Sequence, residues 1–162
     1  MPDKSPRNKG QSLVELMVAL GVIVFGILGV FTLLSRSIGI NRIVLDRYIS
    51  TNLAAEGIEI VKNLIDTNVI QKRVWNAGLD NGNYEVDYDD TALQSVQDRP
   101  LLLDPNSRLY QYNSGAPTTF RRTISIELSP DGNEMKVNSK VEWTSRTAEF
   151  DIDLENHFYN WR

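Results

Sequence analysis

The sequence contains no cysteine and only one histidine, His157, among its 162 residues. The missing cysteines exclude disulfides, thiolate metal sites and cysteine nucleophiles. No Ser-His-Asp arrangement, glycine-rich phosphate loop or H-E-x-x-H motif is present either. We therefore expect no catalytic residue, cofactor or metal in this protein, and we interpret His157 as a structural or surface side chain.

Charge is missing from residues 16–34, a run of nineteen residues. As a helix rising about 1.5 Å per residue, this run would span roughly 28 Å, close to the hydrocarbon thickness of a bilayer. A helix that is apolar on all sides belongs in lipid or inside a larger apolar assembly. Glu15 lies at the edge of the run, where an unpaired carboxylate costs a few kcal/mol in lipid, so its presence indicates a partner.

The few charges before this run are mostly basic, namely Lys4, Arg7 and Lys9. The positive-inside rule places such an N-terminus in the cytoplasm and the chain beyond the apolar run outside. A cleaved secretory signal would have a shorter apolar core and a small-x-small cleavage site, so we expect an anchor helix instead. Without the first ten residues, 14 basic and 20 acidic side chains remain, and this acidic balance argues against nucleic acid as a partner.

Proline is missing between Pro6 and Pro100, which leaves a long stretch free to form helix. After the apolar run, apolar residues recur at spacings of three and four and form one stripe, which we expect to pack on a core. We predict a single helix from about Ser12 to about Ile70, ended by the turn-forming segment 76–83. The stripe consists of Leu53, Ala54, Gly57, Ile58, Val61, Leu64 and Ile65.

Alternating polar and apolar residues in the last third predict an antiparallel meander with one apolar face. Its three strands are expected at residues 119–128, 135–144 and 148–154, with a Pro-Asp-Gly turn after the first. A first strand is expected at residues 84–88, and short candidates at residues 101–103 and 109–112. The helix stripe would cover the sheet, and residues 158–162 would pack against the sheet edge.

Three groups of residues leave alternative interpretations open. The acids of Asp80 to Asp90 could hold calcium through oxygen ligands, but turns use the same residue types. The basic pair Arg121 and Arg122 could contact DNA or protect an edge strand. The apolar run contains Gly21, Gly26 and Gly29, which either let helices approach closely or let this helix loosen.

Gly10-Gln11-Ser12-Leu13-Val14-Glu15, followed by the apolar run, resembles the processing site of type IV prepilins and type II secretion pseudopilins. The resemblance implies that a prepilin peptidase cuts between Gly10 and Gln11 and that Gln11 is then N-methylated. It also implies that Glu15 docks the subunit into a growing filament. Two departures are Gln11 itself, where the family usually has Phe or Met, and the lack of a helix-kinking proline.

The resemblance further implies an α+β pilin fold, in which a long N-terminal helix packs on a C-terminal antiparallel sheet. Residues 1–10 would be a cytoplasmic leader, 11–36 the transmembrane and filament-core half of the helix, 37–75 its amphipathic half, and 76–162 a β head. Implied partners are other pilin subunits, the peptidase, the assembly machinery and, before assembly, the bilayer. We expect a minor pilin at the cell surface; alternatives are a secretion or competence pseudopilin and a signal-anchored protein with a ligand-binding head.

Overall fold

A computed structural model describes residues 9–145 and 148–161, with side chains from Ser12 onward. One helix, α1, extends over Lys9–Ile70 and confirms the prediction of a single long helix. The chain divides into two compact units at Val44. The first unit contains the N-terminal part of α1, and the second contains the rest of α1 and all strands.

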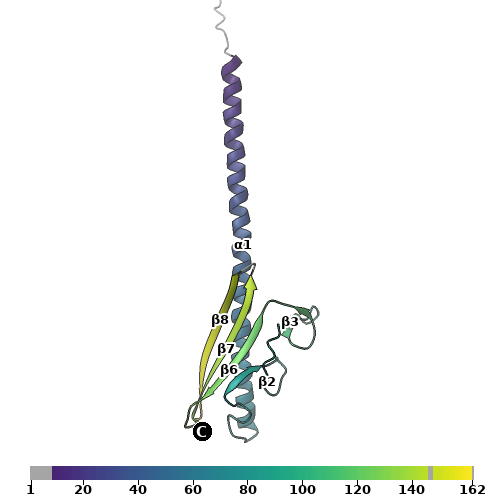
Figure 1. Ribbon diagram of the computed structural model, residues 1–162, viewed down its shortest axis with the longest axis vertical. Helices are drawn as coiled ribbons and strands as arrows, with labels where there is room; N and C mark the ends of the chain where they lie inside the picture. Colours follow the sequence, from purple (N-terminus) through teal and green to yellow (C-terminus); the bar gives the residue numbers. More distant parts are fainter. Residues whose placement is uncertain (1–8, 146–147, 162) are drawn as a thin grey trace, which may run out of the picture. The chain divides into compact units, whose positions relative to one another are not determined.

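The second unit contains a five-stranded antiparallel sheet in the order β2-β1-β6-β7-β8 and a small sheet in the order β4-β3-β5 (Figure 1). The five strands of the large sheet are β1 (Gly82–Glu85), β2 (Gln94–Ser95), β6 (Arg121–Leu128), β7 (Glu134–Ser145) and β8 (Ala148–Tyr159). The small sheet consists of β3 (Leu102–Leu103), β4 (Tyr110–Gln111) and β5 (Ala116–Pro117).

The predicted meander is confirmed as β6, β7 and β8, which lie side by side along α1 (Figure 1). Gly132 has φ = 68° in the turn between β6 and β7, as the Pro-Asp-Gly sequence indicates. The predicted first strand is only partly correct, because β1 ends at Glu85 and the chain then turns. The two-residue strands β2 and β5 are too short to produce a recognisable alternation and were not predicted.

The core lies between the second half of α1 and the large sheet. Five of the seven predicted stripe residues are buried, and Ile58 and Leu64 flank the buried ones. The buried apolar side chains form two clusters, each with residues from α1 and β7; the first also has residues from β6, and the second has Phe120, directly before β6. One contains Ile60, Val61, Ile65, Trp75, Leu79, Val86, Ile124, Ile126, Met135 and Val137; the other contains Leu53, Ala54, Leu101, Tyr112, Phe120, Val141 and Trp143.

The prediction for the C-terminal residues is wrong. Phe158 and Tyr159 lie within β8, because this strand pairs with β7 over twelve residues and extends five residues further than expected. Trp161 does not pack on the sheet edge, since 91% of its surface is exposed. Arg162 lies outside the described residues.

Candidate functional site

The N-terminal motif lies at the beginning of α1. Gly10 and Gln11 are in the first helical turn, and Glu15 follows four residues after Gln11, on the same face of the helix. The Glu15 side chain is exposed and forms no ion pair with another described residue. The side chain of Gln11 lies outside the described part of the chain, and the roles of Gly10 and Gln11 stay predictions.

The helix after Glu15 is apolar on all sides and uncovered. Every large apolar side chain from Leu13 to Leu34 is exposed, from 46% for Val24 to 77% for Phe25. Each such side chain that stays in water forgoes about 1 kcal/mol or more of the hydrophobic stabilisation that burial would give. The length and composition of this helix are sufficient to cross a membrane.

The one hydroxyl within the apolar run is already satisfied by the helix. Thr32 donates its side-chain hydrogen to the carbonyl of Leu28, with an oxygen–oxygen distance of 2.9 Å. Such a bond to the preceding turn removes an unpaired donor, which would otherwise be costly in hydrocarbon. The backbone of this apolar run and its one side-chain hydroxyl therefore both have hydrogen-bond partners within the helix, as a lipid environment requires.

The three glycines of the run leave open notches on the helix surface. A Cβ atom at Gly21, Gly26 or Gly29 would meet nothing within 4 Å. Gly26 lies in a shallow apolar hollow with Ile27 and Val30. These notches fit close approach by another helix, although loosening of the helix would use the same residues.

In the second unit, a polar layer centred on Arg122 attaches α1 to the sheet. Arg122 is 2% exposed and donates from Nη1 to the Leu53 carbonyl (3.1 Å) and to Glu56 Oε1 (3.0 Å). Its Nη2 donates to the Val86 carbonyl at 2.6 Å. Arg122 alternates along the chain with Phe120 of one apolar cluster and Ile124 of the other, so this layer separates the two clusters.

The helix and the sheet are in close contact at Gly57. A Cβ atom on this residue would collide with Ser139 Oγ and with Ile124 Cδ1. Ser139 is fully buried at this contact, opposite Ile124 in the β6–β7 register. A glycine on α1 and a serine on β7 therefore make the room in which Arg122 crosses from the sheet to the helix.

We expect Gly57→Ala to destabilise the second unit by about 1–3 kcal/mol, because the added methyl overpacks a close contact. The gain in helix propensity, about 1 kcal/mol at most, would only partly offset this cost. Urea denaturation followed by circular dichroism measures the change. Gly26→Ala is the matched control, because its methyl meets open space, and an equal loss in both variants would contradict the prediction.

Neither interpretation of the Arg121–Arg122 pair is supported. The two side chains point to opposite faces of β6, and Arg121 pairs with Asp98 at 3.2 Å. Edge protection is wrong, because β6 lies between β1 and β7 within the sheet. Arg122 is the residue that sequence reasoning missed, although its alternation with Phe120 and Ile124 could have placed it on the buried face.

The acids from Asp80 to Asp90 hold loops together. Buried Glu85 forms an ion pair with Arg99 at 2.9 Å, and buried Asp87 accepts the backbone N–H groups of Tyr88 and Tyr112. Asp90 in turn accepts the N–H of Asp87 at 2.8 Å. Within residues 9–145 and 148–161, no group of three or more histidine or acidic side chains is placed to hold a metal ion.

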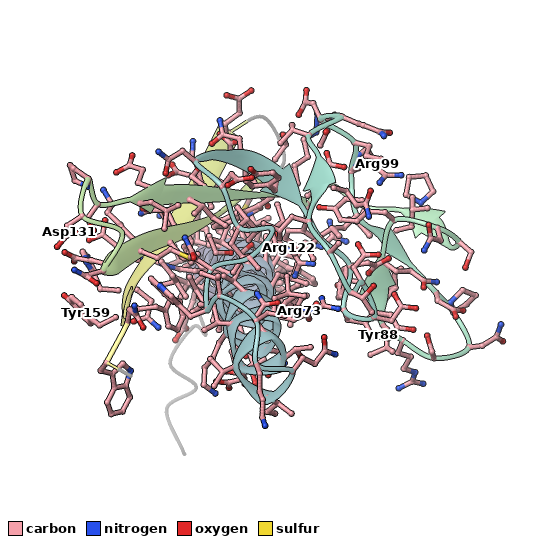
Figure 2. The ribbon with its side chains drawn as sticks, turned by 90° about the horizontal axis from the view of Figure 1, so that it is seen from below. Arg73, Tyr88, Arg99, Arg122, Asp131 and Tyr159 are labelled. Carbon is pink, nitrogen blue, oxygen red and sulfur yellow. The ribbon has the colours of Figure 1, made fainter. Side chains whose placement is uncertain are left out.

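Tyr112 completes this loop arrangement. Burial is the main reason that the pKa of its hydroxyl rises to about 12. The hydroxyl donates to the Arg122 carbonyl at 3.1 Å, and the Arg99 guanidinium lies 4.7 Å from the ring centroid. Figure 2 shows Arg99 and Tyr88 on this side of the second unit, opposite Asp131 and Tyr159.

His157 is a surface residue of β8, between two acids. Its Nδ1 lies 2.6 Å from Glu134 Oε1, and its Nε2 lies 3.1 Å from Glu155 Oε1. The hydrogen bonds to Glu134 and then Glu155 raise the pKa of His157. The bond from His157 is also the main cause that lowers the pKa of Glu134 and of Glu155. The Tyr159 hydroxyl donates to Glu134 as well, at 3.1 Å.

These shifts predict a pH window for the stability of the second unit. The hydrogen bonds that raise the pKa of His157 contribute fully to folding stability below pH 6.5, the ordinary pKa of the group. This contribution is lost as the pH rises through the pKa of the folded state. The hydrogen bonds that lower the pKa values of Glu134 and Glu155 contribute fully to folding stability above pH 4.5, and this contribution is lost as the pH falls through the folded-state values. Urea midpoints of the wild type relative to His157→Gln should therefore differ most between pH 4.5 and 6.5. A difference that is the same at pH 5.5 and pH 8.5 would contradict this.

The N-terminal segment also matches a known family. Residues 5–33 match the family described as the prokaryotic N-terminal methylation motif. No curated protein and no solved structure matches the chain. The matched residues include the predicted cleavage position, Glu15 and almost the whole apolar run, and the helix packed on antiparallel sheets is consistent with an α+β pilin fold. The motif and the fold point to a structural protein, and they support assignment of the chain to the type IV pilin and pseudopilin family.

Proposed function

We propose that the chain is a precursor of a structural subunit, a minor pilin, of a type IV pilus-like filament. Prepilin peptidase cuts it between Gly10 and Gln11, and Gln11 is N-methylated. The subunit waits in the cytoplasmic membrane, with its N-terminus in the cytoplasm, and then enters a filament at the cell surface. Residues 11–36 form the filament core, and the strands are displayed outside.

The observation that supports this proposal is the methylation motif directly before an uncovered apolar helix. Lipid covers such a helix before assembly, and helices of other subunits would cover it afterwards. The cut would create a positively charged amino group on Gln11, which is a natural partner for Glu15 of a neighbouring subunit. Transferring a paired acid and amine from water to an apolar environment costs far less free energy than transferring either charge alone.

Intact mass measurement of membrane-extracted protein tests the processing step. We expect a mature chain that lacks Met1–Gly10 and begins at Gln11, with the added mass of one methyl group. Gly10→Leu is the informative variant, because a bulky residue at the cut should leave the precursor uncut. A mature chain that still begins at Met1, or that is cut beyond Leu34, would overturn the pilin proposal.

Two alternatives give different results. A type II secretion or competence pseudopilin would be cut and methylated in the same way, but sheared surface fibres would not contain it. A signal-anchored membrane protein with a ligand-binding head would keep its first ten residues. The mass measurement separates the last case from the first two, and immunogold imaging of surface fibres separates those two.

A further inference from the structure

The strand β8 has a free edge along its whole length. It pairs with β7 from Ala148 to Tyr159, and no other strand of the described chain pairs with it. In an antiparallel strand, alternate residues point their backbone N–H and C=O groups away from the paired neighbour. Half of the twelve residues of β8 therefore offer unpaired donors and acceptors to an additional strand.

The two faces beside this edge differ in chemistry. On the inner face, Phe150, Ile152 and Leu154 are only partly buried against the core. On the outer face, acidic side chains occupy four alternate positions of β8 in succession, namely Glu149, Asp151, Asp153 and Glu155. A strand added here would have one face beside apolar groups and the other beside carboxylates.

The outer face of β6, β7 and β8 also carries the net charge of the chain. It has seven acidic and three basic side chains, a balance of −4, which equals the net charge of the whole sequence. Lys136 and Lys140 already pair with glutamates of this face. Within the described chain, Glu149 and Asp151 form no ion pair. The residues on this face are Arg121, Glu127, Glu134, Lys136, Lys140, Glu142, Glu149, Asp151, Asp153 and Glu155.

We propose that the free edge of β8 binds an extended segment of a different protein, in which lysine or arginine alternates with apolar residues. Basic side chains of that segment face the carboxylates of β8, and its apolar side chains extend the inner face. A second copy of this chain does not fit, because two β8 strands side by side place acids opposite acids. The same acids thus block self-pairing and select a basic partner.

This edge would bind such a segment whether or not the chain enters a filament. The probe is a synthetic peptide of about ten residues that alternates lysine and valine, added to the full chain in nonionic detergent micelles. Fluorescence polarisation of the labelled peptide should show saturable binding. A peptide that alternates glutamate and valine should not bind.

Two N-methylated peptides test strand pairing separately from charge. Both keep the lysines of the probe. One is methylated on the backbone amides of the lysines and the other on those of the valines. Because a strand pairs through one edge at a time, only one of the two sets should abolish binding. Equal binding by both N-methylated peptides, or equal binding of the glutamate peptide, would overturn the proposal.

Variants of the chain locate the site. Asp151→Asn combined with Asp153→Asn should weaken binding roughly three- to tenfold, the effect of removing two exposed charges. The matched control, Asp66→Asn with Asp89→Asn, removes two exposed acids elsewhere and should leave the affinity unchanged. Equal weakening by both pairs would show unspecific attraction, and a dimer that Asp151→Asn and Asp153→Asn strengthen would make a second copy the true occupant; either result overturns the proposal.

Discussion

Replacing Arg122 by alanine should destabilise the second unit by about 2–5 kcal/mol, the usual effect of truncating a large buried side chain. The guanidinium bridges three elements, since it binds Glu56 and the Leu53 carbonyl on α1 and the Val86 carbonyl after β1. Its loss leaves a cavity between the two apolar clusters and removes the donor for the Val86 carbonyl. With a slope of about 1–3 kcal/mol per molar urea, the midpoint should fall by about 1 M or more.

Arg121→Ala is the matched control for this experiment. Arg121 is the same residue type at the neighbouring position, but it is exposed and pairs with exposed Asp98. A surface ion pair contributes about 1 kcal/mol or less, so this variant should remain close to the wild type. Arg122→Met is expected to lie between the two, because it refills the cavity without restoring the hydrogen bonds. Equal stabilities of Arg121→Ala and Arg122→Ala would show that the polar layer does not hold the helix on the sheet.

The main elements of the fold could be predicted because their signals are local. The spacing of three and four residues revealed the helix to Ile70, and the alternation in residues 119–154 revealed β6, β7 and most of β8. Arg122 was missed because a charged residue was judged by its type and not by its place in the alternation. The bond between Asp87 and Tyr112 joins residues 25 positions apart, and no local period encodes such a contact.

The candidate site and the β8 edge also differ in whether their signals are local in the sequence. The motif from Gly10 to Glu15 is linear, so the sequence alone is enough to identify it, and the family match covers it. The free edge of β8 could not be foreseen, because an edge is defined by which strands fail to pair. Its acids looked like an ordinary solvent face until the strand order placed them beside unpaired backbone.

Glu15→Ala should leave insertion into the membrane intact and should lower the recovery of the protein in sheared filaments roughly tenfold or more. Insertion tolerates the change because alanine removes a charge that is costly in lipid. Assembly should not tolerate it if the amino group of Gln11 on a neighbouring subunit needs this carboxylate, because breaking a charge pair in an apolar surround typically costs about 3–5 kcal/mol. Quantitative blots of membrane and sheared fractions give the ratio.

Two further variants separate a docking carboxylate from a general effect of charge. Glu15→Asp keeps the charge on a shorter side chain and should recover part of the assembly. Glu59→Ala removes an exposed acid from the same helix within the second unit and should assemble normally. Glu15 is exposed and forms no ion pair with another described residue, so its carboxylate is accessible to a neighbouring subunit. If Glu15→Ala assembles as well as Glu59→Ala, the carboxylate has no docking role, and the register of the subunits must come from elsewhere on the helix.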